Sequence, residues 1–399
     1  MFQHQSHLPQ LLAPEAYCSV GQHDRELDRL FLPGWHCIGS LSDLPREGSY
    51  LTLELFGHPL LVWRKEGQVH AYLNVCSHRF CMLTHAARGR QQELTCQYHG
   101  WQYDVCGSTR RIPDAKSFRP MEKGTLGLKK FRAETVGQLV FVTLADDAPP
   151  LAEYLGPAHA LCEELFSSRA QLVLAAIRPN RSNWKVSLEN SLESYHLETV
   201  HATTFGSWPD ERDIFHELWD EMSAVRVTRE AEPSYLHRLG ELVMRLAKID
   251  CDLNYYQFHR YPSLVVARFG MFSWMESVIP TSPTDSYDIW RFYSNVAISG
   301  SLRSRFIAPA LWLWGRWWFE KVIREDERVF PAIQQGLGAP RHPSGGLVSV
   351  REERIFHFQN YIRAAMDGGD RGQRPGVRSQ GPGVRNQEFV SKHAIDPHP

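Results

Sequence analysis

Hydrophobic and polar residues follow two different patterns along this chain, and the change between them separates two regions. Between about residues 35 and 144, short β-branched or aromatic runs end at Gly or Pro, a pattern typical of strands. It predicts strands at residues 49–56, 59–64, 68–75 and 138–144. Residues 13–35, ahead of them, predict a helix-rich lead-in. The first region is therefore expected to be all-β.

Beyond an Asp-Asp-Ala-Pro-Pro segment at residues 146–150, which indicates a linker, the pattern becomes mixed. Residues 367–399 are rich in Gly, Arg, Pro and Gln without apolar periodicity, and they are expected to be disordered. We predict an α+β fold, with the all-β domain ahead of a mixed antiparallel-sheet-and-helix domain. The predicted divisions are 1–35, a helical lead-in packing on the second domain, then 36–150, 151–366 and 367–399. In the second domain we expect helices near 152–168, 187–201, 234–249 and 303–335, and strands near 264–280 and 286–298.

Composition excludes several classes of protein. The formal net charge of −1 gives no reason to expect nucleic acid or an acidic partner. The N-terminal residues lack a basic segment followed by an apolar run, so we expect no signal peptide. The most apolar stretch, residues 306–319, is interrupted by Pro309 and Arg316 and is too short to span a bilayer. Eight cysteines without a disulfide rhythm favour a reducing cytoplasm.

Two short segments of the all-β region each carry one cysteine and one histidine. They are Cys76-Ser77-His78 and Cys96-Gln97-Tyr98-His99. Two thiolates on one iron and two imidazoles on the other form a Rieske [2Fe–2S] centre. A Cys2His2 zinc site uses the same donors, but zinc fingers usually group their ligands as Cys-Cys and His-His. The pairing of one Cys with one His on each loop favours the Rieske centre.

A second set of candidate ligands lies in the mixed region. His196 and His201 are five residues apart, which on a regular helix leaves them roughly 140° out of alignment. They converge on one metal only if the helix ends or bulges between them, and on their own they are more typical of surface or core positions. Glu189, Glu193 and His196 are spaced to share one helix face.

Two imidazoles and one carboxylate make the facial triad of a non-haem Fe(II) oxygenase. The acid-rich turn Arg324-Glu325-Asp326-Glu327 follows an aromatic helical segment and is the best later source of the carboxylate. A solvated charge run is the alternative. The residues alone do not choose among Glu325, Asp326 and Glu327.

Taken together, these motifs closely resemble those of Rieske non-haem iron oxygenases, specifically their catalytic α subunits, over roughly residues 30–365. The family includes aromatic-ring-hydroxylating dioxygenases and choline, carnitine and betaine monooxygenases. The resemblance rests on CSHR, CQYHGWQYD, a Cys-Gly turn, IPDA at 112–115, NWK, EN, ESYH and His201, in that order. It implies that Cys76 and Cys96 bind the inner iron of a [2Fe–2S] cluster, that His78 and His99 bind the outer iron, and that His196, His201 and Asp326 bind the mononuclear iron. Glu193 takes the place of the catalytic carboxylate that links a cluster histidine to an iron-ligating histidine.

The same resemblance implies partners and a reaction. Electrons would come from NAD(P)H through a separate reductase, with or without a ferredoxin, since no dinucleotide fingerprint or plant-type ferredoxin cysteine set is present. A homotrimer is implied, because in this family electrons cross between subunits. The enzyme would use Fe(II) and O2 to hydroxylate or N-demethylate a small organic substrate. The alternative is monohydroxylation or cis-dihydroxylation of an aromatic or natural-product substrate.

Glutamate at position 193, where many ring-hydroxylating members carry aspartate, resembles the branch acting on quaternary amines. Such ligands bind aromatic faces. Candidate cage residues, each of which could equally belong to the core, are Trp208, Trp219, Tyr235, Tyr255, Tyr256, Trp274 and Trp290. Cys81 and Cys106 flank the cluster loops, and we expect Cys81 to be a free buried thiol. A pure electron-transfer Rieske protein and a zinc-stabilised binding protein are the rival functions.

Overall fold

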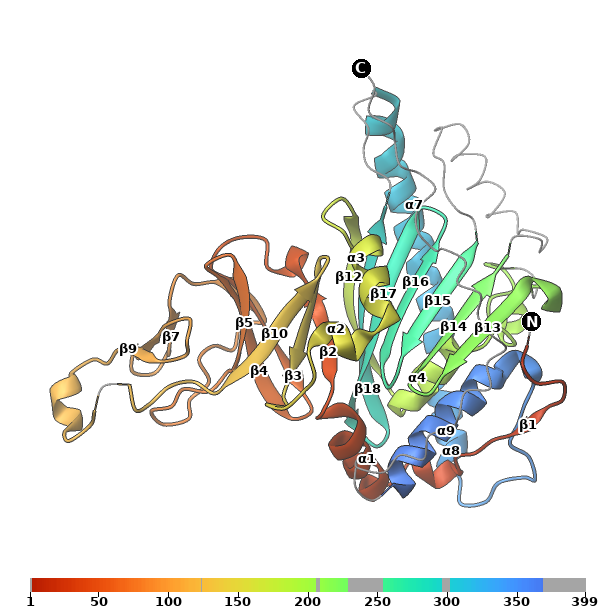
Figure 1. The fold of residues 1–399 in the computed structure, drawn as a ribbon, viewed down its shortest axis with the longest axis horizontal. Helices are drawn as coiled ribbons and strands as arrows, with labels where there is room; N and C mark the ends of the chain where they lie inside the picture. Colours follow the sequence, from red (N-terminus) through yellow and green to blue (C-terminus); the bar gives the residue numbers. More distant parts are fainter. Residues whose placement is uncertain (1, 123, 206–208, 229–253, 296–301, 369–399) are drawn as a thin grey trace. The chain divides into compact units, whose positions relative to one another are not determined.

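Antiparallel sheets dominate both halves of the chain (Figure 1). The computed structural model describes residues 2–122, 124–205, 209–228, 254–295 and 302–368. The helix predicted at 234–249 and nearly all of the predicted tail lie outside these residues. Residues 1–366 form one compact unit. No helix in the described part of the chain is both long and apolar enough to cross a membrane.

The first half is built on a seven-stranded sheet in the order β2-β11-β10-β5-β4-β3-β6. Two-residue loops join β3 to β4 and β4 to β5, and in both loops the two residues have positive φ: Phe56-Gly57 and Glu66-Gly67. Such loops match the twist of the strands that they connect. The strands are β2 (Trp35–Ser40), β3 (Ser49–Leu55), β4 (His58–Lys65), β5 (Gln68–Leu73), β6 (Arg88–Arg90), β10 (Lys130–Val136) and β11 (Leu139–Thr143). The four strands predicted from the sequence are therefore confirmed.

A small three-stranded sheet carries the second Cys–His segment. It consists of β7 (Leu94–Thr95), β8 (Gln102–Tyr103) and β9 (Thr109–Arg111). The segment 96–99 occupies the loop between β7 and β8. The first Cys–His segment begins at Cys76, after β5 has ended at Leu73. Both candidate cluster segments are thus loops that begin within three residues of the end of a strand.

The second half is a seven-stranded antiparallel sheet with helices packed on it, in the order β12-β18-β17-β16-β15-β14-β13. Its strands are β12 (Gln171–Asn180), β13 (Ile214–Trp219), β14 (Met222–Val227), β15 (Tyr255–Arg260), β16 (Leu264–Phe269), β17 (Phe272–Ser282) and β18 (Asp285–Ser294). The α-helices of the described residues are α1 (Val20–Glu26), α2 (Leu151–Leu155), α3 (Pro157–Leu165), α4 (Trp184–Ser191), α5 (Leu197–Val200), α7 (Leu302–Glu327), α8 (Phe330–Leu337) and α9 (Glu353–Asp367). Strand β1 (Leu8–Pro9) pairs with β19 (Leu347–Val348) near the two ends of this unit.

Three of the predicted helices are divided in the structure. The helix expected over 152–168 is α2 and α3, because Gly156 adopts a φ of 53° between them and Pro157 starts the second. The helix expected over 187–201 ends at Ser191 and resumes as α5. The helix expected over 303–335 is α7 and α8. The strand region near 264–280 is the β16–β17 hairpin.

The two halves share packing and one buried ion pair. A single apolar cluster contains Leu60 and Phe141 from the first sheet together with Met275 and Ile289 from the second. Arg291 on β18 pairs with Asp43, which follows β2, at 2.7 Å, and both side chains are 1 % exposed. A buried guanidinium is thereby neutralised by a carboxylate from the other half.

Candidate metal centres and active site

The two Cys–His loops have the same backbone design. In the first loop the N–H of Phe80 donates to the carbonyl of Cys76 at 3.0 Å, and in the second the N–H of Gly100 donates to Cys96 at 3.0 Å. Phe80 (φ 56°) and Gly100 (φ 70°) adopt the left-handed conformation at equivalent positions. This conformation suits glycine and is uncommon for a bulky residue. Each loop thus reverses the chain within four residues of its cysteine.

The four side chains of these loops gather in one place. The rings of His78 and His99 have centroids 4.7 Å apart, and His78 stacks on Trp101 at 4.7 Å and 2°. Both cysteines are buried, with Cys76 1 % and Cys96 2 % exposed. His78 Nδ1 is buried and has no hydrogen-bond partner among the described residues. Two thiols, two imidazoles and a ring nitrogen left free fit a [2Fe–2S] cluster.

Tyr103 on β8 adds a hydrogen-bond donor to this group. Its hydroxyl lies 2.9 Å from Cys76 Sγ and accepts the N–H of Ser77 at 3.2 Å. Burial raises the pKa of Tyr103, so the phenol keeps its proton and can donate it to a thiolate. Hydrogen bonds to ligand sulfurs tune the potential of an iron–sulfur centre. Cys81 is a free thiol, as expected, although it is half-buried rather than buried.

The second candidate centre is formed where the α4 segment stops being a regular helix. Helix α4 ends at Ser191, the chain continues irregularly to His196, and the four-residue α5 separates His196 from His201. The two imidazoles converge, with ring centroids 5.1 Å apart at 64°. From the sequence, the two histidines were expected to converge only where the helix is interrupted, and the structure has that interruption after Ser191.

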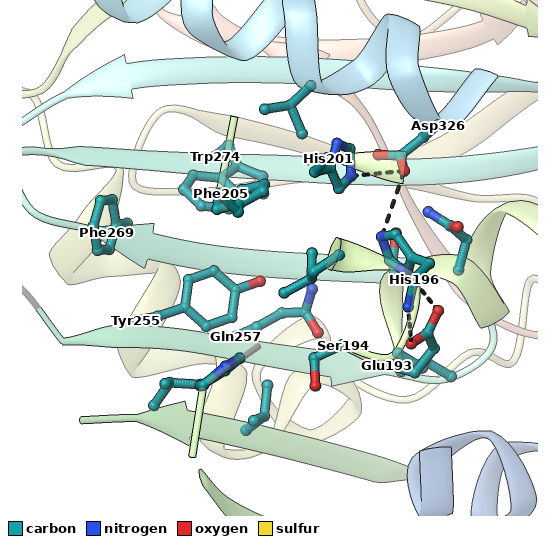
Figure 2. A pocket seen from close by; sticks show the side chains of 18 of the residues that line it. Glu193, Ser194, His196, His201, Phe205, Tyr255, Gln257, Phe269, Trp274 and Asp326 are labelled. Atoms are coloured by element: carbon teal, nitrogen blue, oxygen red, sulfur yellow. Dashed lines mark hydrogen bonds and ion pairs between the residues drawn. The ribbon is translucent and has the colours of Figure 1, made fainter. Parts of the chain in front are cut away.

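The C-terminal part of α7 brings a carboxylate to these two histidines. Asp326 Oδ1 lies 3.0 Å from His201 Nε2 and 3.6 Å from His196 Nε2, as the dashed lines in Figure 2 show. One donor atom from each of the three residues lies within 4.8 Å of the other two. Two imidazoles and one carboxylate on one side of a site fit non-haem Fe(II) with positions left open.

The three consecutive acids of this turn have three different partners. Glu325 accepts from His201 Nδ1 at 2.7 Å and from Thr204 Oγ1 at 2.9 Å, while Glu327 lies 3.5 Å from Arg178. Only Asp326 faces both histidines. A carboxylate on Nδ1 fixes the tautomer so that Nε2 is free to bind a metal. Burial alone would lower the pKa of His201, but Asp326 and Glu325 outweigh it and raise that pKa. No pattern in the sequence indicated this role for Glu325.

Glu193 lies against the first histidine. One carboxylate oxygen contacts His196 Nδ1, and the other accepts the backbone N–H groups of Tyr195 and, at 3.2 Å, His196. The prediction that Glu189 shares this face is wrong, because the helix breaks at Ser191. Glu189 instead accepts the hydroxyl of Tyr17 at 2.6 Å.

The triad lies on the wall of a largely apolar cavity of about 280 Å³. Figure 2 shows Phe205, Trp274, Tyr255 and Phe269 extending away from the triad along the cavity. The aromatic residues of the wall are Phe205, Tyr255, Phe269, Trp274, Trp290, Trp318 and Phe319. Of the predicted cage residues, Tyr255, Trp274 and Trp290 are therefore at the cavity, Trp219 and Tyr256 are not among its lining residues, and Trp208 and Tyr235 lie outside the described residues.

Several buried polar side chains also line the cavity, and the sequence did not single them out. They include Gln257 on β15, Glu276 on β17 and Arg354 on α9. Burial, assisted by Asp288, raises the pKa of Glu276 well above its ordinary value. Glu353 and Arg354 belong to a Arg-Glu-Glu-Arg run that is typical of a solvated helix face, yet both are buried.

Comparison with protein families assigns both halves of the chain. The Rieske [2Fe-2S] domain matches residues 34–132, and the catalytic domain of the ring-hydroxylating alpha subunit matches residues 168–368. The chain belongs to the ring-hydroxylating Rieske oxygenase α subunits. The resemblance and the α+β fold class inferred from the sequence are thereby confirmed, and with them a [2Fe–2S] cluster and a mononuclear iron as the cofactors of the family.

The relatives of this chain are named for different substrates. The glycine betaine monooxygenase oxygenase subunit of Pseudomonas aeruginosa (strain UCBPP-PA14) is 28 % identical over 58 % of this chain and 56 % of its own length. Choline monooxygenase of Atriplex hortensis is 26 % identical over 88 % and 76 % of the two chains. The anthranilate 1,2-dioxygenase large subunit of Burkholderia cepacia is 26 % identical over 74 % and 77 %. This chain spans about half the length of the first curated relatives that it matches.

Solved structures of both substrate branches share the fold. The quaternary ammonium Rieske monooxygenase CntA in complex with L-carnitine has a TM-score of 0.69 at 17 % identity, covering 90 % of this chain and 95 % of that one. Naphthalene 1,2-dioxygenase from Rhodococcus sp. bound to indole has a TM-score of 0.68 at 18 % identity, covering 90 % and 94 %. Because amine and arene oxygenases match equally well, the fold does not choose between their substrates.

Proposed function

We propose that this chain is the catalytic subunit of an oxygenase that uses O2 to oxidise a small organic molecule. His196, His201 and Asp326 would hold Fe(II), and Cys76, Cys96, His78 and His99 would hold the [2Fe–2S] cluster. When bound, the iron activates O2 and the cluster supplies electrons, while the protein supplies binding and orientation. The observation that carries the proposal is the convergence of two imidazoles and one carboxylate on the wall of an apolar cavity.

The chain's own groups prepare this centre before any substrate enters. Glu325 holds the Nδ1–H of His201, and Glu193 occupies the corresponding side of His196. Both imidazoles are thereby oriented with Nε2 toward Asp326. The aromatic walls exclude bulk water, which strengthens electrostatic interactions and suppresses side reactions. Glu193 would also link His196 to a cluster histidine, so that a proton and an electron can move together.

The substrate that we favour is a quaternary or methylated amine, which would be hydroxylated or N-demethylated. Glutamate rather than aspartate at position 193 and the aromatic wall at Tyr255, Trp274 and Trp290 support this choice. So do the glycine betaine and choline monooxygenases among the relatives. The second candidate is hydroxylation of an aromatic ring, which the same wall and the anthranilate dioxygenase relative favour.

Electron delivery would involve other chains. The cluster loops expose apolar surface, with Phe80 79 % and Tyr98 56 % exposed beside the exposed His99. Exposed aromatic residues next to a redox centre are suited to a docking interface. We therefore retain the homotrimer, with electrons crossing between subunits, and a separate NAD(P)H-dependent reductase. The seven described cysteines are free thiols, which is consistent with a reducing cytoplasm.

The test is substrate-dependent consumption of NADH and O2 by the iron-reconstituted protein with a generic reductase, followed by mass spectrometry of the product. The panel sets choline, carnitine and glycine betaine against aromatic acids and polycyclic arenes. Formaldehyde release from a methylated amine would support demethylation, whereas a ring that gains oxygen would move the enzyme to the second candidate.

Two variants give the assay its specificity. Asp326→Ala should lose turnover, whereas Glu327→Gln should keep it, because Glu327 lies against Arg178 and not against the histidines. Equal turnover in both variants would contradict the assignment of the triad.

A further inference from the structure

Arg354 is a buried arginine on the wall of the cavity with one end of its guanidinium unused. The side chain is 1 % exposed. Its Nε donates to Ser223 Oγ at 3.1 Å and its Nη1 to Gln257 Oε1 at 2.8 Å. Nη2 is buried and has no hydrogen-bond partner among the described residues. A buried N–H group of a charged side chain is rarely left unpaired, so a ligand is a reasonable partner for it.

The positive charge of Arg354 is also uncompensated, in contrast to that of the other fully buried arginine. Arg291, equally buried, lies 2.7 Å from Asp43. No carboxylate of the described residues forms an ion pair with Arg354. The titratable groups near it are three phenols and three imidazoles, namely those of Tyr255, Tyr256, Tyr261, His216, His259 and His357. Burial lowers the pKa of Arg354 to about 10, which still leaves it charged at neutral pH. Buried charges are ordinarily paired.

The remaining titratable groups of the cavity do not supply the missing anion. Glu276 accepts from Ser191 Oγ at 3.1 Å, and burial raises its pKa well above the ordinary value, which disfavours its charged form. Burial lowers the pKa of His216, whose Nδ1 faces Glu353 at 2.8 Å. Both groups thus have partners within the protein, and Arg354 is the one arginine or lysine among the described lining residues.

The position of Gln257 indicates where the Arg354 guanidinium lies in the cavity, because the two side chains are hydrogen-bonded. Figure 2 shows Gln257 between Tyr255 and Ser194, with its side chain toward the space below the triad. Its amide oxygen is the acceptor of Arg354 Nη1. An anionic group placed beside Gln257 would thus meet the guanidinium, while the rest of the molecule extended over aromatic walls toward the histidines.

We propose that Arg354 recognises a carboxylate of the substrate, so that this oxygenase acts on an organic carboxylate whose oxidised carbon lies at the triad. The oxidation of this carboxylate rests on the proposed function, whereas its binding by Arg354 does not depend on that function. A cation without an anionic group, such as choline, would be repelled by the buried guanidinium. Zwitterionic betaines and aromatic carboxylates share the required group, and the experiment separates them.

The experiment is isothermal titration calorimetry on the intact, cluster- and iron-loaded protein under anaerobic conditions. Two matched pairs of ligands differ only in charge: glycine betaine and its primary amide, and benzoate and benzamide. The wild type should bind at least one carboxylate more tightly than its amide. Arg354→Gln should lose about tenfold to a hundredfold of the affinity for that carboxylate, with little change for the amide. Arg354→Lys should retain part of the preference.

Arg260→Gln is the control for removing a buried guanidinium elsewhere. Arg260 bonds to Glu221 at 2.8 Å and does not line the cavity, so the variant should keep the preference for carboxylates. A purely structural role of Arg354 would instead weaken carboxylate and amide alike, or lower stability without changing selectivity. If the carboxylate bound directly to the iron, its affinity would be unchanged in Arg354→Gln. Either result overturns the proposal.

Binding and turnover can fail separately. Selective carboxylate binding that requires Arg354, without oxidation of any compound, would support this inference and count against the oxygenase substrate proposed above. Oxidation of choline or an uncharged arene that is unchanged in Arg354→Gln would leave the oxygenase in place and overturn the inference. Selective oxidation of glycine betaine or of an aromatic acid would support it and identify which kind of carboxylate is used.

Discussion

The two candidate metal centres of this chain are built in opposite ways. All four proposed cluster ligands lie between residues 76 and 99, on loops that close through hydrogen bonds within a few residues of each cysteine. The mononuclear site combines two histidines near residue 200 with Asp326, which belongs to α7. The first centre is therefore specified by local turns, and the second by the packing of α7 onto the large sheet.

This difference decides what a change at each site should disturb. A local loop keeps its shape while distant elements move, whereas the triad depends on the relative position of α5 and α7. The residues that hydrogen-bond to the proposed ligands differ in the same way, being nearer in sequence at the cluster and more distant at the triad. Tyr103 on β8 is 27 residues from Cys76 in sequence, but Glu325 reaches His201 from an element more than a hundred residues away.

Removing a triad histidine should have the largest effect and should leave the cluster intact. We expect His201→Ala to lose mononuclear iron and to reduce turnover by more than the about 100-fold that loss of an outer partner costs at metal sites. Its visible spectrum should remain that of the wild type, because the cluster loops do not depend on His201. Metal analysis and absorption spectroscopy measure both. Loss of the cluster signal in a folded variant would show that the two centres are not independent.

Replacing the outer carboxylate should have an intermediate effect. Glu325→Gln keeps the size of the side chain but weakens the hold on His201 Nδ1, so we expect a loss of about 10- to 100-fold in iron affinity or turnover. Glu327→Gln is the matched control, because Glu327 lies in the same turn but is paired with Arg178. Its iron affinity and turnover should stay within about twofold of the wild type. Iron titration of the two variants provides the comparison. Equal losses would mean that helix stability, rather than the orientation of His201, is responsible.

A smaller effect is expected when the local partner of the cluster is removed. Tyr103→Phe deletes the hydroxyl 2.9 Å from Cys76 Sγ without changing the ring. A hydrogen bond to the thiolate stabilises the reduced, more negative cluster, so its loss should lower the reduction potential by about tens of millivolts. Protein-film voltammetry measures the shift. Phe131→Leu, a change in the same half of the chain that does not touch a proposed ligand, is the control and should leave the potential unchanged. An unchanged potential in Tyr103→Phe would mean that the Tyr103 hydroxyl does not interact with the cluster.

The contrast also explains which parts of the structure could be predicted from the sequence. The strands of the first half and all four cluster ligands follow from short patterns: alternation of residues, two-residue turns and paired Cys–His loops. The triad was harder, because the sequence alone left Glu325, Asp326 and Glu327 equivalent, and only the packing of α7 separates their partners. The choice of Asp326 came from the family resemblance.

Residues that act only through long-range contacts gave no local signal. Glu189 was expected beside His196 on the assumption of a continuous helix, but the break after Ser191 turns it toward Tyr17. Arg354 and Glu353 lie in a charged run that indicates an exposed face, and their burial depends on β14, β15 and the N-terminal residues. Binary patterning assigns such positions to solvent because the pattern of one segment does not contain the distant residues that hydrogen-bond to them.

The smallest predicted effect concerns this last long-range contact, which holds the first residues of the chain against α9. The Glu353 carboxylate accepts the backbone N–H groups of Gln3 and His4, each at 2.9 Å, and lies 2.8 Å from Nδ1 of both His4 and His216. Burial alone would raise the pKa of Glu353, but these donors outweigh it and lower that pKa to about 2. In the unfolded chain a glutamate titrates near about 4.3.

Because the folded pKa is the lower one, the unfolded state binds more protons between pH of about 4.3 and 2. The stability that ionised Glu353 contributes is therefore complete above that window and is lost as pH falls through it. Glu353→Gln should lower the free energy of unfolding by about 1–3 kcal/mol at neutral pH. The difference from the wild type should narrow as pH falls below about 4.3. Thermal scans at one scan rate and several pH values test this, with Glu352→Gln as the neighbouring control. A difference that does not change with pH would mean that Glu353 acts through packing and not through its charge.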